Sequence, residues 1–263
     1  PELDDSPLLN VTDTSKYRAL IGSANWIVLL GRFDIAYATN TLARYSMQPR
    51  EGHLKAITRL FGYLKRFTKG KIVIDQYQLN LSAVRYADAS DWTQFYPDAQ
   101  EDIPPNMPKP KGLPAHITVF VDADHAHDKL TCRSITGILV FINGTPIRAL
   151  SKRQKTVESS TYGSEMVAGR VATELIMELR YSLRMLGIPL LGPSTMIGDN
   201  RSVVINTTIP SSMLKKKHNA IAYHRIREAV AANIIRFGHL PGDFNYADVM
   251  TKPLNKDSFH SLV

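Results

Sequence analysis

The chain has 263 residues and a formal net charge of +8, which is long enough for one large or two modest globular domains. A single cysteine, Cys132, excludes a disulfide framework and a cysteine-rich zinc site, and fits a reducing, intracellular setting. The longest apolar run, residues 26–30, is too short to cross a membrane. The basic balance favours a polyanionic partner, with nucleic acid first.

The first part of the chain predicts a smaller, mainly helical region. Apolar residues at three-to-four spacing predict helices over about 15–30, 33–47 and 51–67. The last helix carries a basic face that includes Lys65 and Arg66. Such a face is either simply solvated or a contact surface for nucleic acid, and we treat both residues as candidates for the second role. Residues 71–88 favour one or two strands.

A stretch rich in proline and acidic residues separates this region from the rest of the chain. Few packed elements tolerate such a density of proline, so we predict a domain boundary here. The predicted parts are a helical region at 1–93, a linker at 94–113 and a second domain at 114–263.

The second domain alternates strands with helices. The expected strands cover 117–121, 135–142, 146–150, 195–197 and 234–237, and the expected helices 160–186, 200–207, 219–232 and 244–251. A turn at Asn143-Gly144 joins the second and third strands. This order predicts an α/β fold in which helices flank a mixed five-stranded sheet.

Four carboxylates of this domain stand where elements end or begin. Asp122 ends the first strand, with Asp124 on the same face, and Glu165 heads the core-facing stripe of the long helix. Asp199 follows the fourth strand and Asp248 lies in the last helix. Taken singly, Asp122 and Asp199 are explained by a turn or a helix cap. Glu165 must be solvated at an edge, paired or metal-bound, and Asp248 has no structural role because Asp243 is the better cap. Together they form the kind of oxygen-ligand set that hard divalent cations require.

Motifs around these residues resemble the ribonuclease H domain of copia-type long-terminal-repeat retrotransposons, preceded by the thumb or connection region of their reverse transcriptase. The matching segments in the second domain are Val121-Asp122-Ala123-Asp124, Arg133-Ser134-Ile135-Thr136-Gly137, Ser151-Lys152-Arg153-Gln154-Lys155, Gly198-Asp199-Asn200 and Ala247-Asp248 with Thr251-Lys252-Pro253-Leu254. In the first part, Tyr17-Arg18-Ala19-Leu20-Ile21-Gly22 and Leu60-Phe61-Gly62-Tyr63-Leu64-Lys65 also match.

The resemblance implies an endoribonuclease that hydrolyses the RNA strand of RNA–DNA hybrids with two Mg²⁺ ions, or Mn²⁺ as a substitute. It implies a catalytic and metal-binding set of Asp122, Glu165, Asp199 and Asp248, with Asp124 as a substitute for Asp122. It also implies that the rest of the reverse transcriptase polyprotein is a partner and that the chain works in cytoplasmic virus-like particles. One departure is Gly163, where the family usually has a second glutamate; glycine loosens the start of the helix.

Further residues are assigned by their motifs or positions. Lys152, Arg153 and Lys155 are expected to contact the nucleic-acid backbone, and Asn200 a 2′-hydroxyl of the RNA strand. His239, expected in the loop after the fifth strand, is either a solvated histidine or a mobile general acid.

Two other functions remain open. An integrase or transposase has a related carboxylate set, but its glutamate lies on a later helix, whereas Glu165 lies between the two strand aspartates. A degenerate domain would only brace a polymerase or bind nucleic acid; it predicts a lost carboxylate, and none is lost.

Overall fold

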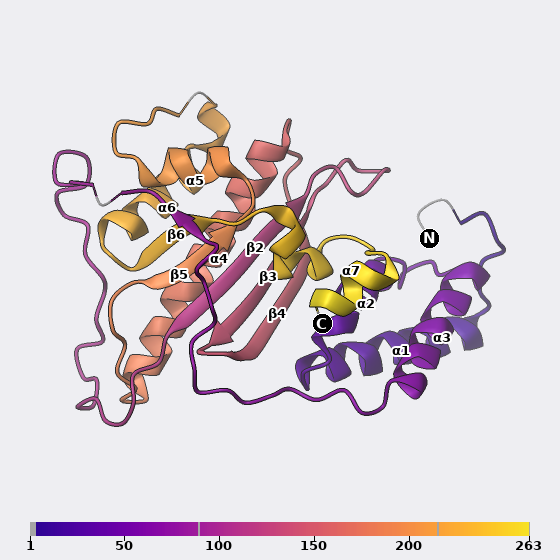
Figure 1. Cartoon of the computed structure of the whole chain (residues 1–263). Coiled ribbons are helices and arrows are strands. Elements are labelled where there is room, and N and C mark those ends of the chain that lie inside the picture. Colours follow the sequence, from indigo (N-terminus) through magenta and orange to yellow (C-terminus); the bar gives the residue numbers. More distant parts are fainter. Residues whose placement is uncertain (1–3, 89, 215, 263) are drawn as a thin grey trace.

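One six-stranded mixed sheet organises the fold in the computed structural model, which describes residues 4–88, 90–214 and 216–262 (Figure 1). Residues 1–3 of the expected helical region therefore lie outside the described residues. The strand order is β1-β6-β5-β2-β3-β4. The strands are β1 (Arg85–Tyr86), β2 (Ile117–Asp124), β3 (Ile135–Ile142), β4 (Thr145–Arg153), β5 (Ser194–Gly198) and β6 (Ile235–His239). This confirms the expected α/β fold with a mixed sheet; the short β1 is a sixth strand, paired antiparallel with β6.

The parallel strands of this sheet bring distant parts of the chain together. β5 pairs in parallel with both β2 and β6, while β2, β3 and β4 form an antiparallel meander. The expected turn between β3 and β4 is confirmed, with Asn143 at φ 53° in the left-handed region that a tight turn requires. β4 extends beyond the expected strand to include Lys152 and Arg153.

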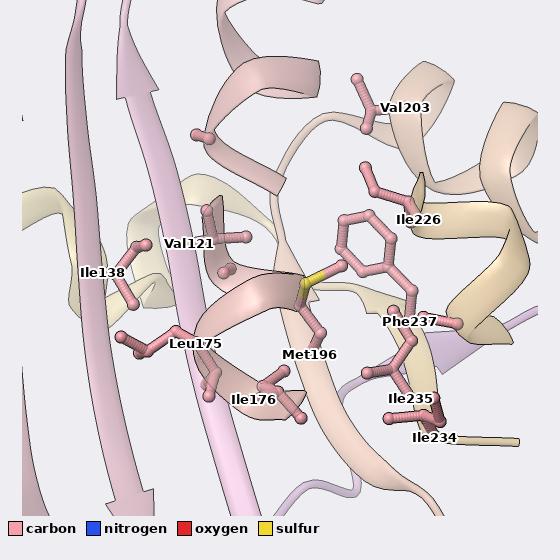
Figure 2. Packing of buried hydrophobic residues seen from close by; sticks show 14 of the residues in the cluster. Val121, Ile138, Leu175, Ile176, Met196, Val203, Ile226, Ile234, Ile235 and Phe237 are labelled. Atoms are coloured by element: carbon pink, nitrogen blue, oxygen red, sulfur yellow. The ribbon is translucent and has the colours of Figure 1, made fainter. Parts of the chain in front are cut away.

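Helices cover one face of the sheet, where the main hydrophobic core lies (Figure 1). They are α4 (Thr161–Met185), α5 (Arg201–Thr208) and α6 (Ala220–Ala231). Alternate residues of β2, β3, β5 and β6 point into this core, and Figure 2 shows Val121, Ile138, Met196 and Phe237 together with Leu175 and Ile176 of α4. The Ser160 side chain caps α4 by accepting from the Gly163 backbone N–H, as expected for a serine before a helix.

The opposite face of the sheet packs against C-terminal 3-10 turns and the helical region. Phe120, Leu139 and Phe141 form a second core with residues of η4 (Tyr246–Met250) and with Ala36. The expected helix over 244–251 is wrong in type, because the structure has the short 3-10 helices η3 (Gly242–Phe244) and η4 there, followed by α7 (Lys256–Leu262). A further 3-10 turn, η2 (Lys217–Asn219), precedes α6.

The helical region consists of α1 (Val11–Leu29), η1 (Phe33–Ile35), α2 (Ala36–Ala43) and α3 (Glu51–Arg66), gathered beside β4 in Figure 1. It has a small core of its own around Tyr17, Ile21 and Ile57. The helices confirm the expected ones within a few residues. Residues 71–84 form no strand, so β1 is the only part of the expected strand pair that the described residues contain.

The proline-rich stretch packs on the second domain along its length. Glu101 receives two hydrogen bonds from Arg180, at 2.6 and 2.8 Å, and one from Arg184 at 2.5 Å. Tyr96 lies 2.7 Å from His224 through its hydroxyl and also accepts from Arg227. We call residues 94–113 the strap. Its position does not test the expected domain boundaries, which stay a prediction.

Candidate metal centre

Three carboxylates converge at one end of the sheet. Asp122 comes from β2, Glu165 from the first turn and a half of α4, and Asp199 directly follows β5. Each offers one oxygen, and the three oxygens lie within 4.8 Å of one another. The register explains the meeting: Phe120 pairs with Ile197 in parallel, so the residues two positions further, Asp122 within β2 and Asp199 just after β5, lie at the same level.

The three carboxylates are poorly compensated by the protein. Burial raises the pKa of Glu165 well above its usual range, and the charges of Asp122 and Asp199 raise it further. Burial also raises the pKa of Asp199, and so does the charge of Asp122. Asp122 and Glu165 are 4% and 6% exposed, so water can stabilise their charges only weakly. A hard divalent cation would compensate these charges with the oxygen ligands that such ions prefer.

Asp248, in η4, lies beside this group but is engaged by another residue. Its Oδ2 is 2.9 Å from Lys252 Nζ, and its buried Oδ1 has no hydrogen-bond partner among the described residues. Burial raises the pKa of Asp248 to about 7, with a further contribution from the charge of Asp122 and an opposing one from Lys252. The next residue in the site, Thr251, donates its hydroxyl hydrogen to Asp122 Oδ2.

Close packing against β3 holds η4 in place. A Cβ atom added to Gly137 would lie 2.5 Å from Thr251 Cγ2, 2.8 Å from the Ala247 backbone oxygen and 2.9 Å from Met250 Cβ. Gly137 pairs with Asp122 across the β2–β3 ladder. The absence of a side chain at this position therefore allows η4 to approach the strand that carries Asp122.

Asp124, considered as a substitute for Asp122, takes a different direction. Its Oδ2 lies 2.6 Å from His127 Nδ1, and the Nε2 atom of the same ring lies 3.1 Å from the Tyr37 hydroxyl. This contact joins α2 to the loop after β2. Asp124 is not among the three clustered carboxylates.

His239 is the last residue of β6, so its expected place in a loop is wrong. Its Nε2 lies 3.0 Å from the backbone oxygen of Asp199. Because a carbonyl oxygen can only accept, Nε2 carries the hydrogen in this contact. The ring thereby fixes the backbone beside a carboxylate of the cluster; its role as a general acid stays a prediction.

The residues expected to contact nucleic acid are dispersed. Lys152 and Lys155 are exposed at or near the end of β4, and the ladder Asp122–Gly137–Ser151 shows that this end of the sheet is also that of the carboxylates. Arg153, by contrast, pairs with Asp128 at 2.5 Å. Asn200, which directly follows Asp199, caps α5 by accepting from the Val203 backbone N–H. Lys65 and Arg66, by contrast, end α3 in the helical region.

Gly163 makes room for a carboxylate that the sequence did not single out. A Cβ atom at residue 163 would lie 2.6 Å from Glu158 Oε2. Glu158 is 7% exposed, and its Oε2 lies 3.4 Å from His218 Nε2. The start of α4 is capped by Ser160, and Glu158 lies close beside Gly163. The expectation that the glycine loosens this helix start stays a prediction. Glu158 is a polar residue before a helix, so only its burial in the structure reveals this contact.

Comparison with known proteins gives relatives that extend over nearly the whole chain. It is 29% identical over 255 residues to the retrovirus-related Pol polyprotein from transposon RE1 of Arabidopsis thaliana, which covers 96% of this chain. The corresponding protein from transposon TNT 1-94 of Nicotiana tabacum is 25% identical over 243 residues and covers 92%. These homologues of the chain are Pol polyproteins of plant retrotransposons. The chain spans about 15% of the length of these Pol polyproteins.

No protein-family model matches the sequence. Among solved structures, the N-terminal RNase H domain of rv2228c from Mycobacterium tuberculosis aligns with a TM-score of 0.42 and 12% identity, over 56% of this chain and 96% of that one. The fold of this chain is defined by the strand order and register of its own sheet. In the described ranges no helix is both long and apolar enough to cross a membrane.

Proposed function

We propose that this homologue of Pol polyproteins is a ribonuclease H that hydrolyses the RNA strand of RNA–DNA hybrids. One observation carries the proposal: three carboxylates with oxygens within 4.8 Å, two of them buried, come from the strand, helix and strand positions that the sequence singled out. Burying such a group costs free energy unless a cation compensates it. The order aspartate, glutamate, aspartate along the chain favours this activity over an integrase.

Each residue near the cluster has a defined part in the proposed reaction. Asp122, Glu165 and Asp199 would hold Mg²⁺, or Mn²⁺ in its place, with Asp248 completing the set. When bound, such ions lower the pKa of the attacking water and stabilise the departing oxygen, which leaves a 3′-hydroxyl and a 5′-phosphate. Thr251 orients Asp122 through its hydroxyl group. His239 is proposed as the general acid and already contacts the Asp199 backbone.

Nucleic acid would approach over the end of the sheet that carries the carboxylates. Lys152 and Lys155 are exposed there and would neutralise backbone phosphates. Arg153 is a weaker candidate, because it would have to leave Asp128. Within the full polyprotein, the remaining reverse transcriptase would be the partner that delivers the hybrid, and virus-like particles the place where it acts.

A cleavage assay with a labelled RNA–DNA hybrid tests the proposal. We expect cleavage that requires Mg²⁺ or Mn²⁺, leaves the DNA strand intact and is absent with duplex DNA. Asp199→Asn should abolish it while the circular dichroism spectrum is unchanged. Asp5→Asn, which makes the same change at an exposed position, should keep the parental rate.

The assay has two outcomes against the proposal. Near-parental turnover by Asp199→Asn would show that the cluster is not the active centre. Binding of the hybrid without cleavage in either metal would favour the alternative of a degenerate domain that serves a structural role.

A further inference from the structure

Lys252 is the basic side chain inside the carboxylate cluster. Its Nζ is 2.9 Å from Asp248 Oδ2, four residues earlier in the chain. The Lys252 side chain is 40% exposed and that of Asp248 11%, so the pair lies at the border between the cluster and solvent. The matching of Thr251-Lys252-Pro253-Leu254 to a family motif gave this lysine no role.

Several carboxylates of the site, and not Asp248 alone, act electrostatically on Lys252. Burial lowers its pKa, but the hydrogen bond to Asp248 and the charges of Asp122, Asp248 and Asp199 outweigh burial and raise it. A lysine ammonium carries a positive charge at neutral pH, and this one lies 2.9 Å from the Asp248 carboxylate. It supplies part of the compensation that the buried acids need.

Asp248 differs from the other three carboxylates in this respect. Among the described residues, Asp122, Glu165 and Asp199 form no ion pair within 4.0 Å, whereas Asp248 Oδ2 is paired with Lys252. A divalent cation at Asp248 would meet the ammonium at short range, and like charges repel strongly where water is partly excluded. The first cation therefore meets three carboxylates that form no such ion pair, and a second cation must compete with Lys252.

We propose that Lys252 is a built-in counter-cation that reserves Asp248, so that the cluster takes its first divalent cation through Asp122, Glu165 and Asp199 alone. A second cation gains Asp248 only when the ammonium moves away. Lys252 is then a positioning residue that sets the difference in affinity between the two cations. This inference rests on the proposed function, because it takes the cluster to be a site for divalent cations.

A titration of the protein with Mn²⁺ at pH 8, without nucleic acid, tests the inference. Electron paramagnetic resonance of the free ion measures how much Mn²⁺ is bound. We expect one strong and one weak site in the parent. Lys252→Met removes the charge at similar length and should tighten the weak site by about tenfold or more. Lys252→Arg should keep it weak. Lys55→Met removes an exposed charge on α3 and should leave both sites unchanged.

A second variant makes the test independent of how Lys252→Met folds. Asp248→Asn should leave the affinity of the strong site within about twofold, because that site does not use Asp248, and should remove the weak site. A strong site lost in Asp248→Asn, or equal affinities for the weak site in the parent and Lys252→Met, would overturn the inference. Failure of the parent to bind Mn²⁺ at all would instead overturn the proposed function.

Discussion

Replacing Gly137 with alanine should disturb the site through packing alone. The added Cβ would lie 2.5 to 2.9 Å from three atoms of residues 247–251, and one of these atoms is the Ala247 backbone oxygen. A backbone oxygen cannot turn aside like a side chain, so η4 must move away from β3. Overpacking of this kind costs about 1–3 kcal/mol. The movement should also separate Thr251 and Asp248 from Asp122.

Urea unfolding followed by circular dichroism, with EDTA present, measures this cost. Gly62→Ala is the matched control: no atom lies within 4 Å of the added Cβ, and the position is inside α3. It should stabilise the protein by up to about 1 kcal/mol, since alanine favours helix. Gly137→Ala should in addition cleave the hybrid at least about tenfold more slowly, as expected for a small misplacement of active-site groups. A Gly137→Ala protein with parental stability and activity would refute the packing argument.

Glu101→Ala should lower the free energy of unfolding by about 3–5 kcal/mol, because it leaves the buried Arg180 guanidinium without its carboxylate; Glu174→Ala, at an exposed pair, should cost less than about 0.5 kcal/mol in the same titration. In EDTA, the stability of the parent should fall as pH rises from about 4.5 to 7.5, because carboxyls with raised pKa bind more protons in the folded than in the unfolded state. A thermal melt series should show a shallower fall for Asp199→Asn, and an equal slope would contradict this account. His239→Ala should lower kcat by about tenfold with Mn²⁺ affinity unchanged; weaker Mn²⁺ binding would indicate a structural role.

The three clustered carboxylates could be predicted because strand order and helix phase determine them. Asp122 and Asp199 lie at the same end of two parallel neighbouring strands, and Glu165 heads the core-facing stripe of α4, so backbone geometry brings them together. What surrounds them could not be predicted in the same way. Lys252 pairs with Asp248 at the end of a 3-10 turn where we expected an α-helix, and the sequence does not reveal that this turn packs closely on Gly137.

The contacts made by loop residues also could not be predicted from the sequence. Proline and acidic composition predicted the strap as a linker, yet composition does not reveal that Glu101 meets two arginines of α4. Arg153 looked like a phosphate contact, but Asp128 holds it; hydrogen bonds from Thr131 and Arg153 overcome the effect of burial and lower the pKa of Asp128 to about 2. In both pairings the acidic partner lies outside helices and strands, in a segment whose sequence carries no periodic signal.

Because η4 packs against β3 from near the end of the chain, the carboxylate cluster stays incomplete until the last part of the protein is synthesised. A ribosome synthesises β2, α4 and β5 before η4, so the growing chain contains three mutually repelling acids before Thr251 and Lys252 exist. Contacts between such distant segments form late in folding, since a long loop must close first. A translation product that stops before residue 247 would lack the hydroxyl that orients Asp122 and the ammonium that offsets the cluster. We therefore expect such incomplete products to be unable to degrade RNA.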